Sequence, residues 1–409
     1  MKGIALHWQI LIALVLAIPF GLFASDYAVY VTWMGDVFLR GLKMIIVPLI
    51  LSSIISGITN LGSGDSLGRL GLKTLVYYLS TSFLAIVTGL LFVNLLQPGV
   101  GAPKQPGTDT SMLEKASQTS FGDTLMEMIP TNVFAALSAG NMLAIIFFAI
   151  LFGFFTTRVE EKYSRLLTDF FNAVFEVMMK ITMFIILFTP FGVFGLVVDT
   201  VAEQAGDAEA LAAMAGSLGI YMLTVALALT THFFLSLPLI VYVFARVNPY
   251  QHLRNMATPL LTAFSTSSSS ATLPLTMEAV EHKSGVSNKI SSFTLPLGAT
   301  VNMDGTALYE CVAALFIAQA YGVELSLGQQ VLVVFTALLA SIGAAGIPMA
   351  GLVMISVVLT AVDLPLEGVG MILAVDRVLD MMRTATNVWS DTCGAVLVAK
   401  SEGEVLKLS

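Results

Sequence analysis

The chain has 409 residues, of which 56% are hydrophobic and 11% are charged, and its formal net charge is −8. Soluble globular proteins carry about 25% charged residues, so this composition excludes an ordinary soluble domain and indicates an integral membrane protein. Apolar runs close to the ~20 residues needed to cross a bilayer favour transmembrane helices over the short alternating strands of a β-barrel. The basic residues form no patch, so nucleic acid is not an expected partner.

The chain opens with a lysine and an apolar run, as a secretory signal peptide does. No small-residue cleavage site follows, and further apolar runs do, so this segment is expected to be the first transmembrane helix. Cys311 and Cys393 lie far apart in apolar surroundings and are expected to be reduced core thiols. Continuous apolar runs predict membrane-spanning helices at about residues 8–25, 42–62, 74–97, 131–156, 166–198 and 214–246.

The loops between these runs differ in charge. Basic residues mark the loops near residues 69–73, 158–165 and 246–254, whereas the loops at 98–130 and 199–213 are acidic or mixed. Because cytoplasmic loops carry an excess of Lys and Arg, the basic loops and the N-terminus are expected on the cytoplasmic side. The chain is therefore expected to be a multi-pass protein of the cell's inner (plasma) membrane.

After residue 250 the apolar runs become short and interrupted. The run at 255–281 is broken by serines, the run at 289–321 by NMDGT, and the run at 328–362 by GAAGIPMAG. The run at 366–400 is unbroken but contains six charged residues before Lys400. Irregular backbone is tolerated at membrane depth only where protein or a water-filled cavity satisfies it, and paired interruptions often mark a transporter's binding site. The last third is therefore expected to be the working part, with two re-entrant hairpins.

A polar stripe runs along the segment 376–391. At about 100° per residue, its six polar residues fall within an arc of roughly 100° on one helix. They are Asp376, Asp380, Arg383, Thr384, Asn387 and Asp391. A solvated face or an interhelical salt bridge would also produce such a stripe. Ionisable residues inside the membrane indicate a functional site by default.

Asp304 precedes Gly305 inside an apolar run, which predicts an unwound turn whose carbonyls and carboxylate could bind a hard cation. Alternatively, Asp304 caps the second half-helix. Glu310 shares a helix face with Thr306, and the alternative to a functional role is a neutral, hydrogen-bonded buried acid.

The ionisable residues of these segments do not balance. The acids are Asp304, Glu310, Asp376, Asp380 and Asp391, and the bases are Arg377 and Arg383. Five acids minus two bases leave three negative charges, each costing about 2.5–3.5 kcal/mol at the bilayer centre. Such a site calls for cations: hard metal ions such as sodium, protons, or a substrate amine. An arginine offers a planar fork to a carboxylate, so a substrate carrying both an amine and carboxylates would satisfy Asp380 and Arg383 together.

Other functions are less well supported. Residues 64–68 match the hydrolase pattern G-x-S-x-G but lie in a loop between membrane helices, where the required strand and helix are missing. No Walker A motif is present, which argues against ATP-driven transport by this chain. His232 lies within an apolar run with no partner identifiable from sequence, which favours a core role. An ion channel, with the polar stripe lining a pore, remains an alternative.

Several segments together resemble one known family. They are, in chain order, KMIIVPLILSSIISG, YYLSTS, SSSSATLP, NMDGT, GAAGIPMAG and DRVLDMMRTATNVWSD. Over nearly its whole length the chain resembles the glutamate transporter family, the dicarboxylate/amino acid:cation symporters. Its motifs are close to those of the excitatory amino acid transporters, and its short loops resemble those of prokaryotic members.

The resemblance implies an all-α membrane protein with eight transmembrane helices and two opposed re-entrant hairpins, assembled as a homotrimer. In this family a transport domain slides against a scaffold like an elevator. The implied scaffold segments are 1–73 and 131–213. The implied transport segments are 74–130, which includes an extracellular loop, 214–250, and the core at 251–409.

The resemblance also implies a substrate site. A serine hairpin closes this site from the inside and a glycine-rich hairpin from the outside; their implied contacts are Ser267, Ser268 and Ser269, and Ile347 and Gly351. Asp380 would bind the substrate amine and Arg383 its side-chain carboxylate. Thr306, Thr384 and Asn387 would add hydrogen bonds.

Three sodium sites are implied. One uses Asp391 with carbonyls of Gly298, Asn302 and Asn387. Another uses Tyr78, Thr81, Ser82, Asn302 and Asp304, with Met303 counted among the ion-site residues. The third uses carbonyls of Thr300, Ser341, Ile342 and Ala344. Glu310 matches the proton-carrying glutamate of the animal transporters, which makes a proton a further candidate coupling ion.

The chain departs from the family pattern at three positions. Family members place a second arginine at the position of Ser267 or of Met381, and neither is basic here. Arg377 lies one turn before Met381 on the same helix face, so the hypothesis is that Arg377 replaces that arginine. Ser390 replaces a usual glycine, with no consequence evident from sequence. The missing arginine after Asp380 does not favour potassium counter-transport.

The sequence therefore predicts a secondary active transporter, not an enzyme, for sodium-coupled uptake of aspartate or glutamate, with or without a proton. The alternatives within the family are a C4-dicarboxylate carrier, whose substrate lacks the amine expected by Asp380, and a neutral amino acid carrier, which would not use Arg383.

Overall fold

The computed structural model describes residues 6–60, 65–102, 126, 128–342 and 350–408, and every regular element in these ranges is helical. The first half contains α1 (Leu6–Phe23), η1 (Ser25–Tyr30), α2 (Trp33–Asn60), α3 (Asp65–Leu96), α6 (Val133–Ala139), α7 (Met142–Thr156), α8 (Glu161–Ile186), α9 (Thr189–Glu203) and α10 (Ala208–Thr231). The second half contains η2 (His232–Ser236), α11 (Leu237–Ile240), η3 (Val241–Ala245), α12 (Pro249–Asn255), α13 (Ala257–Thr266), α14 (Ser269–Ala279), η4 (Val280–Ser284), α15 (Asn288–Val301), α16 (Asp304–Ala320), α17 (Leu327–Ile342), α18 (Ala350–Ala361), η5 (Leu366–Gly368) and α19 (Val369–Ser401). The predicted all-helical class is confirmed.

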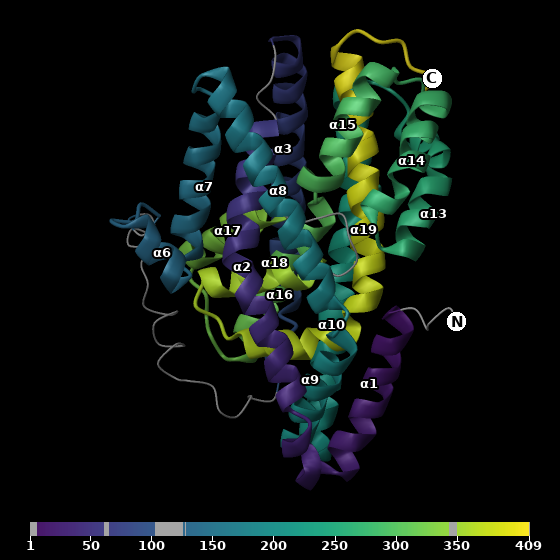
Figure 1. The fold of residues 1–409 in the computed structure, drawn as a ribbon. Helices are drawn as coiled ribbons and strands as arrows, with labels where there is room; N and C mark the ends of the chain where they lie inside the picture. The colour runs from purple at the N-terminus through teal and green to yellow at the C-terminus, as the bar shows by residue number, and fades with distance from the viewer. Residues whose placement is uncertain (1–5, 61–64, 103–125, 127, 343–349, 409) are drawn as a thin grey trace, which may run out of the picture.

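The helices pack in two groups (Figure 1). Helices α1, α2, α7, α8 and α9 pack mainly on one another, whereas α3, α10 and α13 to α16 gather around α19. Small residues allow close approach within the first group: a Cβ atom on Gly195 would stand 2.5 Å from the backbone nitrogen of Gly35. Close backbone packing through small residues is typical of helices in membranes.

Four described helical segments are long and apolar enough to span a bilayer: Trp33–Thr59, Arg69–Leu96, Ala208–Ala245 and Asn288–Ala320. Helices α8 and α9 pass the same test together but are bent by 53° at the two residues between them, so the described residues contain up to five spans by length and composition. The last turn of α8 is followed by Pro190 inside the first turn of α9, a position where proline is well tolerated.

Several boundaries differ from the sequence predictions. Helix α2 begins at Trp33 rather than near residue 42, and α3 begins at Asp65 rather than near residue 74. The run at 131–156 is divided at Gly140, which has the left-handed φ of 70°, and Asn141 then caps α7 through the Ala144 N–H. The run at 166–198 is the bent α8–α9 pair. The predicted runs followed hydropathy, which passes over the charged start of α2 and over single breaking residues such as Gly140, Asn141 and Pro190.

In the second half, the breaks fall where the sequence indicates. Helix α13 ends at Ser267, which has the left-handed φ of 53°, and α14 starts immediately afterwards with Ser268 as its cap. Helices α15 and α16 are separated by Asn302 and Met303. In Figure 1 α13 and α14 lie side by side next to α19. The segment between α17 and α18 lies outside the described residues, as does most of the loop at 98–130.

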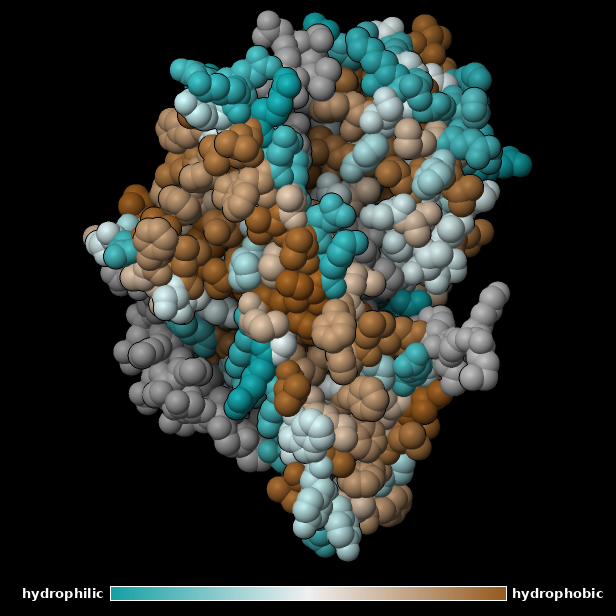
Figure 2. Space-filling view, viewed as in Figure 1, coloured by the Kyte–Doolittle hydropathy of each residue, from teal (hydrophilic) through white to brown (hydrophobic). Residues whose placement is uncertain are grey.

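The surface agrees with a membrane setting. Hydrophobic side chains cover much of the flank formed by α2, α7 and α8, and hydrophilic ones gather near the upper end, where α3, α13 to α15 and the end of α19 meet (Figure 2). Many large apolar residues are exposed on these helices, including Met44 and Phe155. Water would penalise such exposure, and a lipid environment removes that penalty.

Candidate substrate and ion site

The polar stripe of α19 is buried, although its residues are charged. Asp376, Asp380 and Arg383 each have a relative exposure of 1–2%. The guanidinium of Arg383 donates to Asp380 Oδ1 from Nε (3.0 Å) and Nη2 (2.8 Å), and its Nη1 lies 3.2 Å from Asp376 Oδ1. The stripe is therefore neither a solvated face nor a bridge to another helix: its acids and arginine pair along one helix.

Two other helices enclose Arg383. The ring of Tyr309 on α16 lies under the guanidinium, 4.3 Å from its carbon to the ring centroid. Gly351 at the start of α18 lies so close that a Cβ atom there would stand 2.5 Å from Arg383 Nη1. Only glycine leaves room for this approach of backbone to a charged group. Ile347, expected beside Gly351, lies outside the described residues.

The serine-rich tip between α13 and α14 reaches the same stripe. Ser267, Ser268 and Ser269 are all buried, and the Ser268 hydroxyl caps α14 by accepting from the Ala271 N–H. Arg377 Nη1 donates to the Ser267 hydroxyl over 2.9 Å and lies 3.6 Å from Asp380 Oδ2. Arg377 therefore joins this tip to the carboxylate expected to receive an amine.

Asn387 connects α19 to the break between α15 and α16. Its side-chain oxygen accepts from the Gly305 N–H at 2.7 Å, and its amide nitrogen donates to Thr306 Oγ1 at 3.1 Å and contacts Met303 Sδ at 3.2 Å. Thr384 is buried on the same face of α19. The side chains of Asn387 and Thr306 thus bring the first turn of α16 against the polar stripe.

One group of oxygen atoms surrounds Asp391. Its Oδ1 accepts from the Asn302 amide at 2.9 Å. A Cβ atom on Gly298 would overlap this carboxylate and stand 2.8 Å from the Tyr78 hydroxyl. The Tyr78 hydroxyl itself donates to the Thr294 carbonyl, so Tyr78 lies beside Asp391 and makes no hydrogen bond to Asp304.

A second group surrounds Asp304, which is completely buried. Ser82 and Thr81 donate to its Oδ1 at 2.6 and 3.3 Å. Its Oδ2 contacts Ser390 Oγ at 2.6 Å and His232 Nε2 at 3.1 Å. The carboxylate is therefore surrounded by four side chains from three helical segments, and the alternative of a simple helix cap does not describe it.

Sequence reasoning missed two members of this group. His232 was assigned a core role and Ser390 no role. The sequence did hold a general indication that His232 contacts a polar group. A histidine within a membrane span needs a polar partner, because an isolated one is costly in hydrocarbon. Which acid would meet it depends on how α10 packs against α16, and no local pattern encodes that.

The third expected set is incomplete. Thr300 near the end of α15 and Ser341 and Ile342 at the end of α17 come from two helices that contact each other, and Ala344 lies outside the described residues. The Thr300 and Ser341 hydroxyls bond to carbonyls of their own helices. Their backbone carbonyls lie at helix ends, where carbonyls lack intrahelical partners.

Glu310 lies on α16, fully buried, and within the described structure neither of its carboxylate oxygens has a hydrogen-bond partner. Burying a charged carboxylate without a partner is far more costly than burying the neutral acid. Glu310 is therefore not the hydrogen-bonded buried acid considered as the alternative to a functional role. Its burial makes it chemically suited to carrying a proton.

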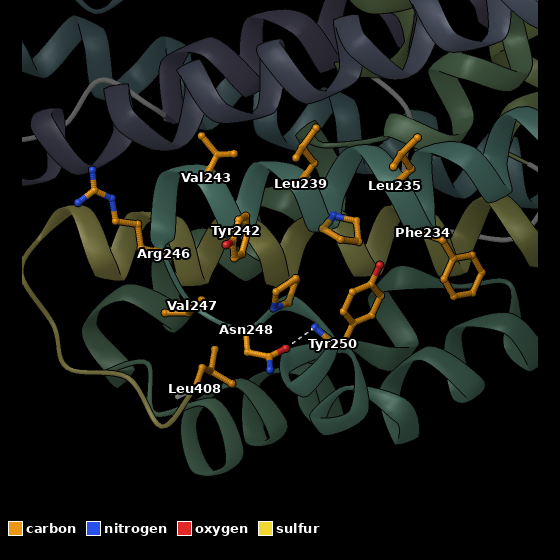
Figure 3. A pocket seen from close by; sticks show the side chains of 12 residues that line it. Phe234, Leu235, Leu239, Tyr242, Val243, Arg246, Val247, Asn248, Tyr250 and Leu408 are labelled. Atoms are coloured by element: carbon orange, nitrogen blue, oxygen red, sulfur yellow. Dashed lines mark hydrogen bonds between the residues drawn. The ribbon is translucent and has the colours of Figure 1, made fainter.

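Among the described residues no cluster of three or more His, Cys, Asp or Glu could hold a metal ion. A cation bound at Asp304 or Asp391 would therefore meet one carboxylate together with hydroxyl, amide and carbonyl oxygens, a ligand set suited to hard monovalent ions. A separate groove of about 890 Å³ runs along η2, α11 and η3 towards Leu408 (Figure 3). Arg246 is its only charged lining residue, so this groove does not have the paired charges of the α19 site.

Comparison with known proteins agrees with this geometry. The sequence profile of the sodium:dicarboxylate symporter family matches residues 6–401. The chain belongs to this family. It is 39% identical to an excitatory amino acid transporter of Caenorhabditis elegans, over 90% of this chain and 81% of that protein. It is 37% identical to excitatory amino acid transporter 3 of Mus musculus, over 96% of this chain and 85% of that protein.

A bacterial relative matches over a greater share of its own length. The proton/sodium-glutamate symport protein of Bacillus caldotenax is 36% identical, over 99% of this chain and 96% of that protein. The predicted family is thus confirmed. Symporters move solutes across membranes without converting them, so the chain is a membrane transporter and not an enzyme.

Proposed function

We propose that the chain takes up acidic amino acids, aspartate or glutamate, together with sodium ions. The observation that carries the proposal is the Asp380–Arg383 pair, buried beneath the serine tip and the Gly351 backbone. A buried carboxylate and a buried guanidinium side by side match a substrate that has both an ammonium and a second carboxylate.

Binding would exchange partners rather than create unpaired charges. Arg383 would turn its fork from Asp380 to the substrate's side-chain carboxylate, while Asp376 stays on the other edge of the guanidinium. Asp380 would then receive the substrate amine. Thr306, Thr384 and Asn387 lie along the same face and would supply hydrogen bonds. Because each buried charge keeps a partner, the desolvation penalty of the site changes little.

Sodium ions would neutralise the two buried acids Asp391 and Asp304. We assign one ion to Asp391 with carbonyls of Gly298, Asn302 and Asn387, and a second to Asp304 with Thr81, Ser82 and Asn302. Tyr78 is assigned near Asp391. The third assignment rests on carbonyls of Thr300, Ser341, Ile342 and Ala344. The close approach of Gly298 to Asp391 supports the first of these, because it brings a backbone segment onto a carboxylate.

The proposal extends to the architecture. The first group of helices would form the scaffold at residues 1–73 and 131–213. Segments 74–130, 214–250 and 251–409 would form the transport domain, and the separate packing of the two groups supports this division. The pairs α13–α14 and α17–α18 would be the two opposed re-entrant hairpins within an eight-span fold. A homotrimer and elevator-like movement follow from the family resemblance.

Two alternatives use the same fold. A C4-dicarboxylate would satisfy Arg383 but leave Asp380 without an amine, and a neutral amino acid would satisfy Asp380 but leave Arg383 unused. The paired arrangement of these residues favours the acidic amino acid. A proton carried on Glu310 is a further component of the proposal, supported by the burial of this acid without a hydrogen-bond partner.

The test is uptake of radiolabelled aspartate, glutamate, succinate and alanine into proteoliposomes. Sodium, proton and potassium gradients are imposed one at a time. Sodium-dependent, saturable accumulation of aspartate or glutamate is expected. Preferred accumulation of succinate or alanine, or flux that is not coupled to sodium in a fixed ratio, would contradict the proposal; the second result would instead favour a channel.

A further inference from the structure

A chain of hydrogen bonds joins the two carboxylates assigned to separate sodium ions. Ser390 Oγ donates to Asp304 Oδ2 at 2.6 Å and accepts from Asn302 Nδ2 at 3.0 Å. The same amide nitrogen donates to Asp391 Oδ1 at 2.9 Å. Its two hydrogens thus serve Ser390 and Asp391, and Ser390 is the link between the two ion sites.

Ser390 is well placed for this role. Its side chain is fully buried, and the Tyr77 hydroxyl donates to its carbonyl at 3.1 Å, which fixes the backbone at this turn of α19. Thr81 also lies between Asn302 and Asp304, but the two side-chain atoms it meets there, at 3.5 and 3.3 Å, are acceptors, as are the Tyr77 and Tyr78 carbonyls of its own helix. Its single proton cannot serve both side-chain atoms, so Thr81 does not complete a donor–acceptor chain between them.

A serine hydroxyl has one rotatable proton and two lone pairs. When a cation binds Asp304, the proton of Ser390 can turn away from Oδ2, and a lone pair then faces the ion. The second lone pair still accepts from Asn302. The hydroxyl can therefore act as a cation ligand without releasing the amide that orients Asp391.

We propose that Ser390 is an oxygen ligand of the cation held at Asp304, and that through Asn302 it couples this ion to the one held at Asp391. The proposal rests on the sodium-coupled function proposed above. It assigns a binding role to a side chain outside the sets expected from the family. Removing the hydroxyl would remove a ligand from one site and release the amide that the two sites share.

The test compares Ser390→Ala with Thr392→Val. Thr392 lies two residues further along α19, is equally buried, and its hydroxyl donates to the Trp389 carbonyl of its own helix. Sodium dependence is measured in proteoliposomes at fixed ionic strength, with choline as the replacement ion. Sodium-induced thermal stabilisation of the detergent-purified protein gives a second readout without substrate.

For Ser390→Ala, the sodium concentration for half-maximal uptake should rise about tenfold, the effect of losing one hydrogen-bonding ligand worth about 1 kcal/mol or slightly more. The Hill coefficient for sodium should fall, because the shared amide is no longer held. The thermal response should shift to higher sodium in parallel. Ser390→Gly should behave in the same way and serves if the alanine variant folds poorly. Thr392→Val should keep the sodium half-saturation and the substrate KM of the unmodified protein.

The outcomes separate this inference from the function on which it rests. If the unmodified protein takes up acidic amino acids without sodium dependence, the proposed function fails. If its uptake depends on sodium but Ser390→Ala keeps the same half-saturation and Hill coefficient, the role of Ser390 is refuted. Equal shifts in Ser390→Ala and Thr392→Val would also refute it, because they would indicate a general packing effect.

Discussion

The guanidinium of Arg377 donates to the Ser267 hydroxyl over 2.9 Å, although 110 residues separate them in the chain. Arg377 lies on α19 and Ser267 at the tip between α13 and α14, in the left-handed region with a φ of 53°. The same guanidinium lies 3.6 Å from Asp380. One positive charge therefore contacts both the tip expected to close the substrate site and the acid expected to bind the amine.

This relationship supports the hypothesis that Arg377 replaces an arginine that family members keep elsewhere. Arg377→Ala should weaken acidic amino acid binding by roughly tenfold to a hundredfold. Truncating one partner of a buried, hydrogen-bonded charge pair costs about 2 kcal/mol or more. Arg377 is about one-quarter exposed, which reduces this cost. Uptake kinetics in proteoliposomes measure the effect. The affinity of Arg377→Lys should lie between those of the unmodified protein and Arg377→Ala. Unchanged affinity and rate in Arg377→Ala would exclude the hypothesis.

Gly298 should tolerate no side chain. A Cβ atom there would overlap Asp391 and crowd the Tyr78 hydroxyl, so Gly298→Ala should displace the carboxylate assigned to sodium. We expect at least a tenfold higher sodium requirement for uptake, by the cost of overpacking at about 1–3 kcal/mol. Gly216→Ala is the matched control, because a Cβ atom on Gly216 meets nothing within 4 Å. Equal sodium dependence in the two variants would show that Asp391 does not hold the ion.

Glu310→Gln should separate proton coupling from sodium coupling. Glutamine has nearly the shape of the neutral acid but cannot release a proton. The expected result is sodium-driven uptake that no longer responds to a proton gradient, measured with a pH-sensitive dye inside the proteoliposomes. If the unmodified protein already ignores the proton gradient and Glu310→Gln is fully active, Glu310 is a buried neutral acid with no transport role.

His252 lies outside the membrane-spanning segments, buried against Trp389 and 2.8 Å from Ser284 Oγ. Burial lowers the pKa of His252 from 6.5 to about 4. Between these values the unfolded chain binds a proton that the folded chain excludes, so the free energy of unfolding rises with pH across this window and is reduced as pH falls through it.

His252→Asn should therefore reduce the loss of melting temperature between pH 7 and pH 5, by several degrees for a shift of this size. The measurement is thermal unfolding of the purified protein in detergent at both pH values. His282→Asn, at an exposed position in the middle of η4, serves as the comparison. An unaltered pH dependence in His252→Asn would mean that this histidine is not held neutral.

The sequence predicts the helical class, the breaks at the serines and at NMDGT, and the family, because each has a local signal. Hydroxyl and glycine residues interrupt an apolar pattern, and charged residues recur at helical spacing on α19. The division at Gly140 and the bend between α8 and α9 carry weaker signals, because only one or two residues, Gly140 with Asn141 and Pro190, mark each break within a long apolar run.

The site could be predicted as a set of residues but not as a set of contacts. That Asp380 and Arg383 pair follows from their spacing of three on one helix. The contact of His232 with Asp304 depends on how η2 packs near α16, and the contact of Arg377 with Ser267 depends on how α13 packs on α19. Helical periodicity encodes neither arrangement. Ser390 shows the same limit: its hydroxyl is linked to Asp304 directly and to Asp391 through Asn302, and these residues come from different helices.

The residues after α19 are tied to the ends of three earlier helices. Glu402 pairs with Arg69 and Lys73, Glu404 accepts from the Ser287 N–H, and the Lys407 N–H donates to the Ser284 carbonyl, so this tail fastens the beginnings of α3 and α15 to the end of η4. Anyone preparing the protein for purification therefore needs a flexible spacer between Leu408 and an affinity tag. A tag fused closer would pull on these contacts and loosen the end of the domain proposed to move.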